Sequence, residues 1–104
     1  MSAYDLIFEA LGDPTRRKML DMIRGRPRTV GELTSKLPIT QPAVSQHLKV
    51  LRNADLVAVK KEGTRRIYSL NRQGMKALRS YTDAFWGDIL DAFGQSVSET
   101  EKKK

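Results

Sequence analysis

The sequence contains no cysteine and only one histidine among its 104 residues. Without thiols the chain can form neither a disulfide nor a thiolate metal site, and it has no cysteine nucleophile. Short secreted proteins are often held together by disulfides, so the absence of cysteine favours the cytoplasm. We therefore expect a cytoplasmic protein that folds around an apolar core without a metal or another cofactor.

Long apolar runs and a signal-peptide pattern are missing as well. No stretch approaches the ~20 apolar residues that span a bilayer, and Asp5 and Glu9 stand where a secretory signal would have basic residues. We expect no membrane association. The length predicts one small domain with a modest core, so burial against a second copy would add stability.

The positive charge is concentrated in the middle of the chain. The net charge is +7, yet residues 1–13 carry −3 and residues 80–104 carry −2. Residues 14–79 hold 16 Lys and Arg against four acidic residues, a net charge of +12. Such a distribution is expected of a nucleic-acid-binding unit flanked by segments with a different task. A charged surface that serves solubility alone is the alternative explanation.

Apolar periodicity and capping residues predict a winged helix-turn-helix fold, mainly α with a small β-hairpin, in the order α-α-α-α-β-β-α. Helices are expected over residues 4–11, 14–24, 30–37, 41–54 and 72–93, and strands over residues 56–62 and 65–70. Only Pro38-Ile39-Thr40 separates the third and fourth helices, as in a helix-turn-helix, and Gly63-Thr64 forms the hairpin turn of the wing. We expect a single domain over residues 1–94 and a flexible polar tail over residues 95–104.

The fourth helix has the pattern of a recognition helix. With Val44, Leu48 and Leu51 turned inward, short polar residues face outward on its N-terminal half, where a recognition helix meets base edges in the major groove. The residues expected to contact DNA from this helix are Gln41, Pro42, Ser45, Gln46, His47 and Lys49. Lys49 and Arg52 suit phosphates better than base edges. His47 lies at the boundary, where it can bond to a phosphate or pack on the helix pair. An ordinary solvated helix face is the alternative explanation.

Cations gather at the predicted wing. Lys60, Lys61, Arg65 and Arg66 bracket the turn at Gly63, whereas an edge hairpin needs only one or two charges to discourage aggregation. We expect Lys61, Arg65 and Arg66 to reach the minor groove or its phosphates. A second basic group, residues 16–18, begins the second helix and is open to two explanations: contacts with phosphates or solvated surface.

These motifs together resemble the ArsR family of small winged-helix repressors. The stretches that carry the resemblance are Ala10–Arg17, Gly31–Leu33, Gln41–Leu51 and Gly63–Tyr68, and the similarity covers roughly residues 3–93. The resemblance implies a homodimer whose interface is formed by the first and last helices, in agreement with the strongly apolar pattern of both. The residues expected in the interface are Tyr4, Ile7, Phe8, Leu11, Phe85, Trp86, Ile89 and Phe93.

The chain departs from the family pattern in two places. Asp55 stands where the family usually has glycine, and aspartate tolerates the left-handed conformation required there at some cost. The metal sensors of the family carry cysteines in the third helix or Asp and His ligands in the last helix. Here the third helix has none, and the last helix has three aspartates without histidine. We therefore expect a regulator that does not respond to metal ions.

The sequence predicts a sequence-specific repressor that binds double-stranded DNA as a homodimer on an inverted-repeat operator. A nonspecific nucleic-acid-binding module and a winged helix used for protein contacts are the alternatives. Enzymatic activity is not expected, because there is one histidine, no nucleophile in a recognisable setting and no phosphate-cradling glycine loop. The sequence does not identify what relieves repression. Three options remain: no ligand at all, a small molecule at the dimer interface, or a partner protein.

Overall fold

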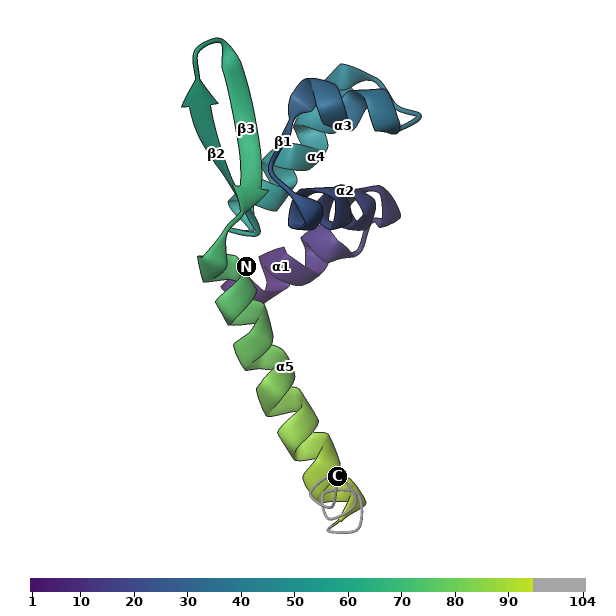
Figure 1. The fold of residues 1–104 in the computed structure, drawn as a ribbon. Helices are drawn as coiled ribbons and strands as arrows, with labels where there is room; N and C mark the ends of the chain where they lie inside the picture. The colour runs from purple at the N-terminus through teal and green to yellow at the C-terminus, as the bar shows by residue number, and fades with distance from the viewer. Residues whose placement is uncertain (95–104) are drawn as a thin grey trace.

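The computed structural model describes residues 1–94 and contains the predicted winged helix-turn-helix (Figure 1). Its elements are α1 (Ala3–Leu11), α2 (Pro14–Gly25), β1 (Arg28–Thr29), α3 (Val30–Lys36), α4 (Gln41–Asn53), β2 (Val57–Glu62), β3 (Arg65–Leu70) and α5 (Arg72–Phe93). Helices α1 to α4 and the hairpin β2–β3 form a body from which α5 extends outward. Each helix and strand predicted from the sequence is confirmed to within one residue at either end. The tail predicted over residues 95–104 lies outside the described residues.

The helices begin where their capping residues stand. Asp13, Thr29, Thr40 and Asn71 each accept a hydrogen bond from a backbone N–H group in the first turn of the helix that follows. A side-chain oxygen in this position satisfies a donor that has no partner within the helix. The caps therefore account for the accuracy with which the helix starts could be predicted.

One short strand, β1, was not predicted. Arg28 pairs with Tyr68 and Thr29 pairs with Ile67, so the sheet has three antiparallel strands in the order β1-β3-β2 and not two. Two residues are too few for an alternating apolar pattern, and Pro27 just before them suggests only the end of a helix. The pairing places the start of α3 beside the base of the wing, because Thr29 is also the N-cap of α3.

The core lies between α1 to α4 and the base of the hairpin. The predicted inward stripe of α4, Val44, Leu48 and Leu51, is at most 1% exposed. Its buried partners are Ile7, Ala10, Met19, Ile23, Leu33, Leu37, Ala54, Leu56, Val57 and Tyr68. In contrast, Gly74 is the only residue of α5 that is fully buried. None of the helices in residues 1–94 combines the length and the apolar character needed to cross a bilayer.

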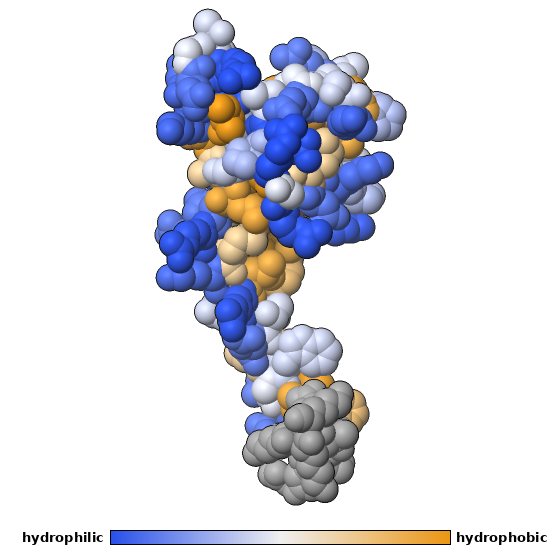
Figure 2. Space-filling view, in the orientation of Figure 1, coloured by the Kyte–Doolittle hydropathy of each residue, from blue (hydrophilic) through white to orange (hydrophobic). Residues whose placement is uncertain are grey.

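Apolar side chains gather where α5 leaves the body (Figure 2).

Gly74 in the first turn of α5 lies against the turn that follows α4. A Cβ atom added at Gly74 would stand 2.0 Å from the carbonyl oxygen of Asp55. Asp55 itself has φ 58°, the left-handed conformation expected at this position. The close approach requires glycine, because neither the helix nor the turn leaves room for a side chain.

Replacing Gly74 by alanine should therefore destabilise the fold. The clash involves backbone atoms of Asp55, which cannot move without displacing α5 or the hairpin, and overpacking of this kind costs about 1–3 kcal/mol. Gly87→Ala is the matched control, because nothing lies within 4 Å of a Cβ atom there. Alanine should stabilise that exposed helical position by about 0.5–1 kcal/mol. Urea unfolding of both variants measures the difference, and equal stabilities would contradict the close packing at Gly74.

Candidate nucleic-acid interface

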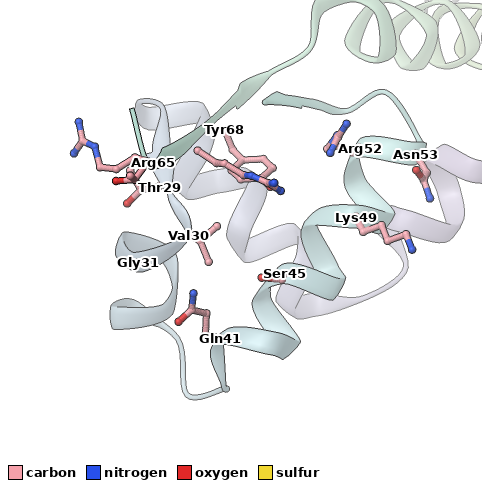
Figure 3. A pocket seen from close by; sticks show the side chains of 12 residues that line it. Thr29, Val30, Gly31, Gln41, Ser45, Lys49, Arg52, Asn53, Arg65 and Tyr68 are labelled. Carbon is pink, nitrogen blue, oxygen red and sulfur yellow. The ribbon is translucent and has the colours of Figure 1, made fainter. Parts of the chain in front are cut away.

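A groove of about 820 Å³ separates the exposed face of α4 from the wing (Figure 3). Its lining residues are Thr29, Val30, Gly31, Gln41, Ser45, Lys49, Arg52, Asn53, Thr64, Arg65, Arg66 and Tyr68. Four of these carry positive charge and none is acidic. The groove therefore presents a positive potential of the kind that attracts a phosphate backbone.

Helix α4 supplies one wall of the groove through its spacing. Gln41, Ser45, Lys49 and Arg52 follow one another at intervals of four, four and three residues, so they share one side of the helix. The uncharged polar members lie toward the N-terminal end and the cations toward the C-terminal end. This side of α4 can offer hydrogen bonds to base edges at one end and to phosphates at the other.

The wing supplies the cations of the opposite wall. Strands β2 and β3 pair so that Glu62 faces Arg65 across a two-residue turn, and Gly63 takes φ 65° at the first of the two turn positions. Positive φ at that position fits a type II′ hairpin turn. Among residues 1–94, the arginines in ion pairs are Arg16, Arg24, Arg26 and Arg79. Within these residues, none of the four cations that line the groove forms an ion pair with a carboxylate.

The structure brings together most, though not all, of the residues expected to contact DNA. Five of them line the groove: Gln41, Ser45, Lys49, Arg65 and Arg66. Pro42 and Gln46 are exposed on α4 beside the groove, and Lys61 is exposed on β2 outside it. His47 is half-buried, and its Nδ1 atom lies 3.3 Å from Nη1 of Arg16. His47 therefore contacts α2, and its bond to a phosphate stays a prediction.

Sequence reasoning missed several lining residues. Arg52 is not one of them, because the sequence already suggests Arg52, with Lys49, as a residue suited to phosphates, and it lines the groove. Thr29, Val30 and Gly31 carry no sequence signal, because the unpredicted pairing of β1 with β3 brings them to the groove. Tyr68 is 5% exposed, so its side chain belongs mainly to the core and reaches the groove only at its edge.

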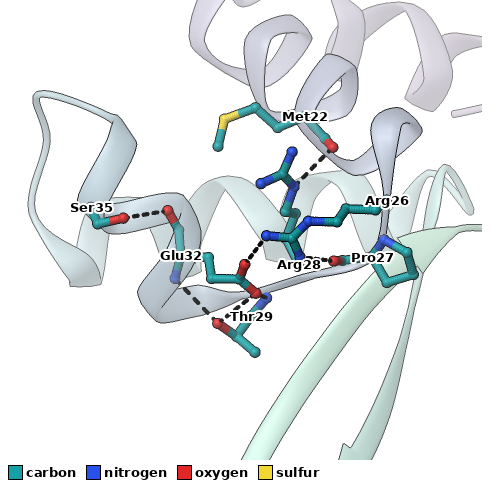
Figure 4. Close-up of polar contacts among 7 residues, drawn as sticks. All are labelled: Met22, Arg26, Pro27, Arg28, Thr29, Glu32 and Ser35. Carbon is teal, nitrogen blue, oxygen red and sulfur yellow. Dashed lines mark hydrogen bonds and ion pairs between the residues drawn. The ribbon is translucent and has the colours of Figure 1, made fainter.

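The start of α3, at one edge of the groove, is held by an ion pair (Figure 4). The guanidinium of Arg26 bonds to the carboxylate of Glu32, which also accepts hydrogen bonds from the backbone N–H and the hydroxyl of Thr29. Thr29 in turn accepts from the backbone N–H of Glu32, which completes a capping box. The Arg26 bond, followed by the Thr29 N–H bond, lowers the pKa of Glu32 from 4.5 to about 2.

Glu32 should therefore make stability depend on acid pH. Its pKa is lower in the folded chain than in the unfolded chain, so its contribution is complete above pH 4.5 and is lost as the pH falls toward 2. A Glu32→Gln variant should be less stable than the wild type at neutral pH, and the gap should close across this window. Chemical unfolding at several pH values between 6 and 2 measures it. A gap that stays constant would contradict the role of the carboxylate.

A second surface of note joins α1 to α5. Tyr81 contacts Tyr4 and Phe8 with ring centroids 5.1 and 4.9 Å apart, and Phe85 continues the series between Tyr81 and Trp86. Phe85, Trp86 and Phe93 are 48%, 56% and 70% exposed. A row of exposed aromatic rings is unusual for an isolated chain and is typical of an interaction surface.

Not every residue expected at a dimer interface lies on this surface. Ile7 is only 1% exposed and belongs to the core of the single chain. The apolar pattern of α1 could not separate core residues from interface residues, since it covers most of the helix. Leu11 and Ile89 are half-buried.

Among residues 1–94, no three Asp, Glu or His side chains lie close enough to hold a metal ion together.

Comparison with known proteins agrees with this architecture. Residues 13–59 match the family model described as bacterial regulatory protein, arsR family. The chain is 45% identical over 100 residues to the HTH-type transcriptional regulator Rv2034 of Mycobacterium tuberculosis, covering 93% of this chain and 94% of that protein. It is 38% identical over 65 residues to the transcriptional repressor SdpR of Bacillus subtilis, covering 62% of this chain and 72% of the repressor.

A solved structure shares the fold along most of the chain. The crystal structure of a possible transcriptional regulator for arsenical resistance superposes with a TM-score of 0.70 at 40% identity, covering 82% of this chain and 88% of that one. The similarity therefore extends well beyond the helix-turn-helix segment. The chain belongs to the ArsR family of bacterial regulatory proteins and is a DNA-binding transcriptional regulator.

Proposed function

We propose that this regulator is a sequence-specific repressor that binds an inverted-repeat operator as a homodimer. The cationic groove between α4 and the wing is the observation that carries the proposal. Its shape gives a phosphate backbone a path between two cationic walls while the polar end of α4 stays exposed. The similarity to the transcriptional repressor SdpR supports repression rather than activation.

Each group of residues has a role in this proposal. Gln41, Pro42, Ser45 and Gln46 face base edges in the major groove, where glutamine can pair with adenine and serine can bond to several bases. Lys49, Arg65 and Arg66 neutralise phosphates, and Arg52 joins them from the end of α4. Lys61 on the outer strand of the wing serves the same purpose. His47 contacts Arg16 of α2 and so helps to hold α4 in place, and it does not read a base.

The homodimer forms through the aromatic surface of α1 and α5. Tyr4, Phe8, Phe85, Trp86 and Phe93 are exposed in one chain and would be covered by a second copy. Leu11 and Ile89 extend this surface, while Ile7 is omitted because it is buried within the chain. Two recognition helices held in this way would enter successive major grooves, with half-sites about 34–36 Å apart or a multiple of that distance.

We further propose that the protein is cytoplasmic, that it is not an enzyme and that residues 1–94 form one domain. The signal that relieves repression is not a metal ion. Zinc sensing normally requires several nitrogen, sulfur or carboxylate ligands held together. Chelation of the purified protein should leave its operator affinity unchanged. A change of more than about twofold on chelation, reversed by added zinc, would contradict this part of the proposal.

The uncharged polar end of α4 favours specific over nonspecific binding, because contact with phosphates alone would favour Lys and Arg there. Titration of the purified protein against the upstream region of its own gene tests the difference. We expect tight binding to one inverted repeat and at least 1,000-fold weaker binding to a scrambled repeat, on the order seen for specific regulators. A reporter under that promoter should rise when the gene is deleted. Equal affinity for both DNAs would contradict the proposal and favour a nonspecific module.

A further inference from the structure

The side chain of Arg16, near the start of α2, joins three helices. Its Nε atom donates to the carbonyl oxygen of Ala10 at 2.7 Å, and Nη2 donates to that of Glu9 at 3.0 Å, both in the last turn of α1. Its Nη1 atom lies 3.3 Å from Nδ1 of His47 on α4. The side chain is only 15% exposed, and its contacts with Ala10 and His47 are partly buried, whereas that with Glu9 is exposed.

The chemistry of the two side chains fixes the direction of the last contact. A guanidinium is always protonated in a protein and can only donate, so Nδ1 of His47 must accept and the ring proton is carried by Nε2. Asp13 faces the same guanidinium from the N-cap of α2, with its Oδ2 atom 4.0 Å from Nη1. It also accepts hydrogen bonds from the backbone N–H groups of Thr15 and Arg16. Arg16 is therefore held in place from its own helix before it reaches α1 and α4.

The helices that Arg16 joins have different tasks in the proposed function. Helix α1 carries Tyr4 and Phe8, whose rings contact Tyr81 of α5 on the dimer surface. Helix α4 carries Ser45 and Gln46 just before His47. A rotation or shift of α4 relative to α1 would change the spacing of the two recognition helices in a dimer. Such a shift would affect base contacts more than phosphate contacts, because base contacts depend on register.

We propose that Arg16 is a positioning residue that fixes the recognition helix relative to the dimer helices and so sets sequence specificity, without contacting DNA itself. The inference rests on the proposed function, since it requires a specific operator. Arg16 belongs to the basic group for which contacts with phosphates were one explanation. The structure instead directs its donors toward protein acceptors.

Arg17 provides a matched control. Its Nη1 atom donates to the carbonyl oxygen of Leu11 at 2.7 Å, so it also caps α1. No hydrogen bond or ion pair found in the described residues links Arg17 to α4. The two neighbouring arginines both cap α1 and carry the same formal charge. Arg16 differs in bonding to two carbonyls of α1, in its ion pair with Asp13 and in its link to His47.

The experiment compares operator and scrambled DNA for Arg16→Ala, Arg17→Ala and the wild type. Arg16→Ala should lose operator affinity by about 10- to 100-fold, the cost of one or two good base contacts. Its affinity for scrambled DNA and its salt dependence should change little. Arg17→Ala should change both affinities by less than about twofold. Circular dichroism and sedimentation confirm that each variant is folded and dimeric.

His47 variants keep the test independent of the capping of α1. His47→Ala should lose as much operator affinity as Arg16→Ala. The double variant should lose no more than either single variant, because both substitutions break the same contact between Arg16 and His47. His47→Asn, which keeps an acceptor near the position of Nδ1, should recover most of the operator affinity. Arg16→Lys should not, because one ammonium group cannot span two carbonyls and the imidazole.

Three outcomes would overturn the inference while leaving the proposed function intact: additive losses in the double variant, full recovery with Arg16→Lys, or equal losses on operator and scrambled DNA. Additive losses would mean that His47 contacts DNA directly. Recovery with lysine would mean that Arg16 acts through its charge. A wild type that does not discriminate between the two DNAs would instead contradict the proposed function itself.

Discussion

A Phe85→Glu variant should be monomeric at concentrations where the wild type is a dimer, and it should bind the operator about 100- to 10,000-fold more weakly, the range by which linking two sites raises affinity. Phe85 is 48% exposed in the single chain and lies between Tyr81 and Trp86 in the aromatic series. A dimer would bury an unpaired carboxylate at this position, which is strongly unfavourable. The single chain would keep its fold, because the core does not include Phe85.

The only tryptophan of the chain, Trp86, reports on the same surface. Dilution of the wild type should shift its fluorescence to longer wavelength as the dimer dissociates, and Phe85→Glu should show the shifted emission at every concentration. Ser80→Glu is the matched control, because Ser80 is an exposed residue of α5 that helical spacing places away from Phe85 and Trp86. A Phe85→Glu protein that sediments as a dimer, or binds the operator like the wild type, would contradict the assignment of the interface.

Removing the two arginines of the wing should have a comparable effect on DNA binding through a different cause. In the proposed dimer, Arg65→Ala/Arg66→Ala would remove four phosphate contacts. At about 1 kcal/mol for each contact this corresponds to an affinity loss of roughly 1,000-fold. The slope of log affinity against log salt should fall by about 3.6, because each contact contributes about 0.9. Operator and scrambled DNA should weaken alike, since phosphate contacts carry no sequence information.

Lys76→Ala/Arg79→Ala is the control for this variant. It removes the same charge from exposed positions on α5, outside the residues that line the groove. Fluorescence anisotropy across a series of salt concentrations gives affinity and slope together. If the control lowers the salt slope as much as the wing variant does, the net charge of the protein accounts for binding and the groove has no special part in it.

The sequence was sufficient for the helices and the hairpin because their signals are local. Asp13, Thr29, Thr40 and Asn71 mark the helix starts through a bond to the next turn of the chain, and Gly63 marks the hairpin turn through its positive φ. The inward stripe of α4 follows from helical spacing alone. Features that depend on three or four neighbouring residues can be derived before any tertiary contact is known.

The features that escaped prediction all depend on contacts between distant segments. Strand β1 exists because Thr29 meets Ile67 across 37 intervening residues, and the same contact brings the start of α3 to the groove. Ile7 is buried in the core of the single chain, where α1 packs against α2 and α4 as well as α5, and an apolar pattern on α1 cannot reveal this. Arg16 looked like any other surface cation until its partners on α1 and α4 were known.

Operator spacing tests the central claim most directly, because it requires both the DNA-binding groove and the dimer. The measurement compares the affinity of the protein for its inverted repeat with that for the same half-sites moved apart by five base pairs, about half a helical turn. We predict that the insertion lowers the affinity to nearly that of a single half-site, and that a ten-base-pair insertion, which restores the same face of the DNA, weakens binding less. Equal affinity for all three spacings would contradict a rigid homodimer with two recognition helices.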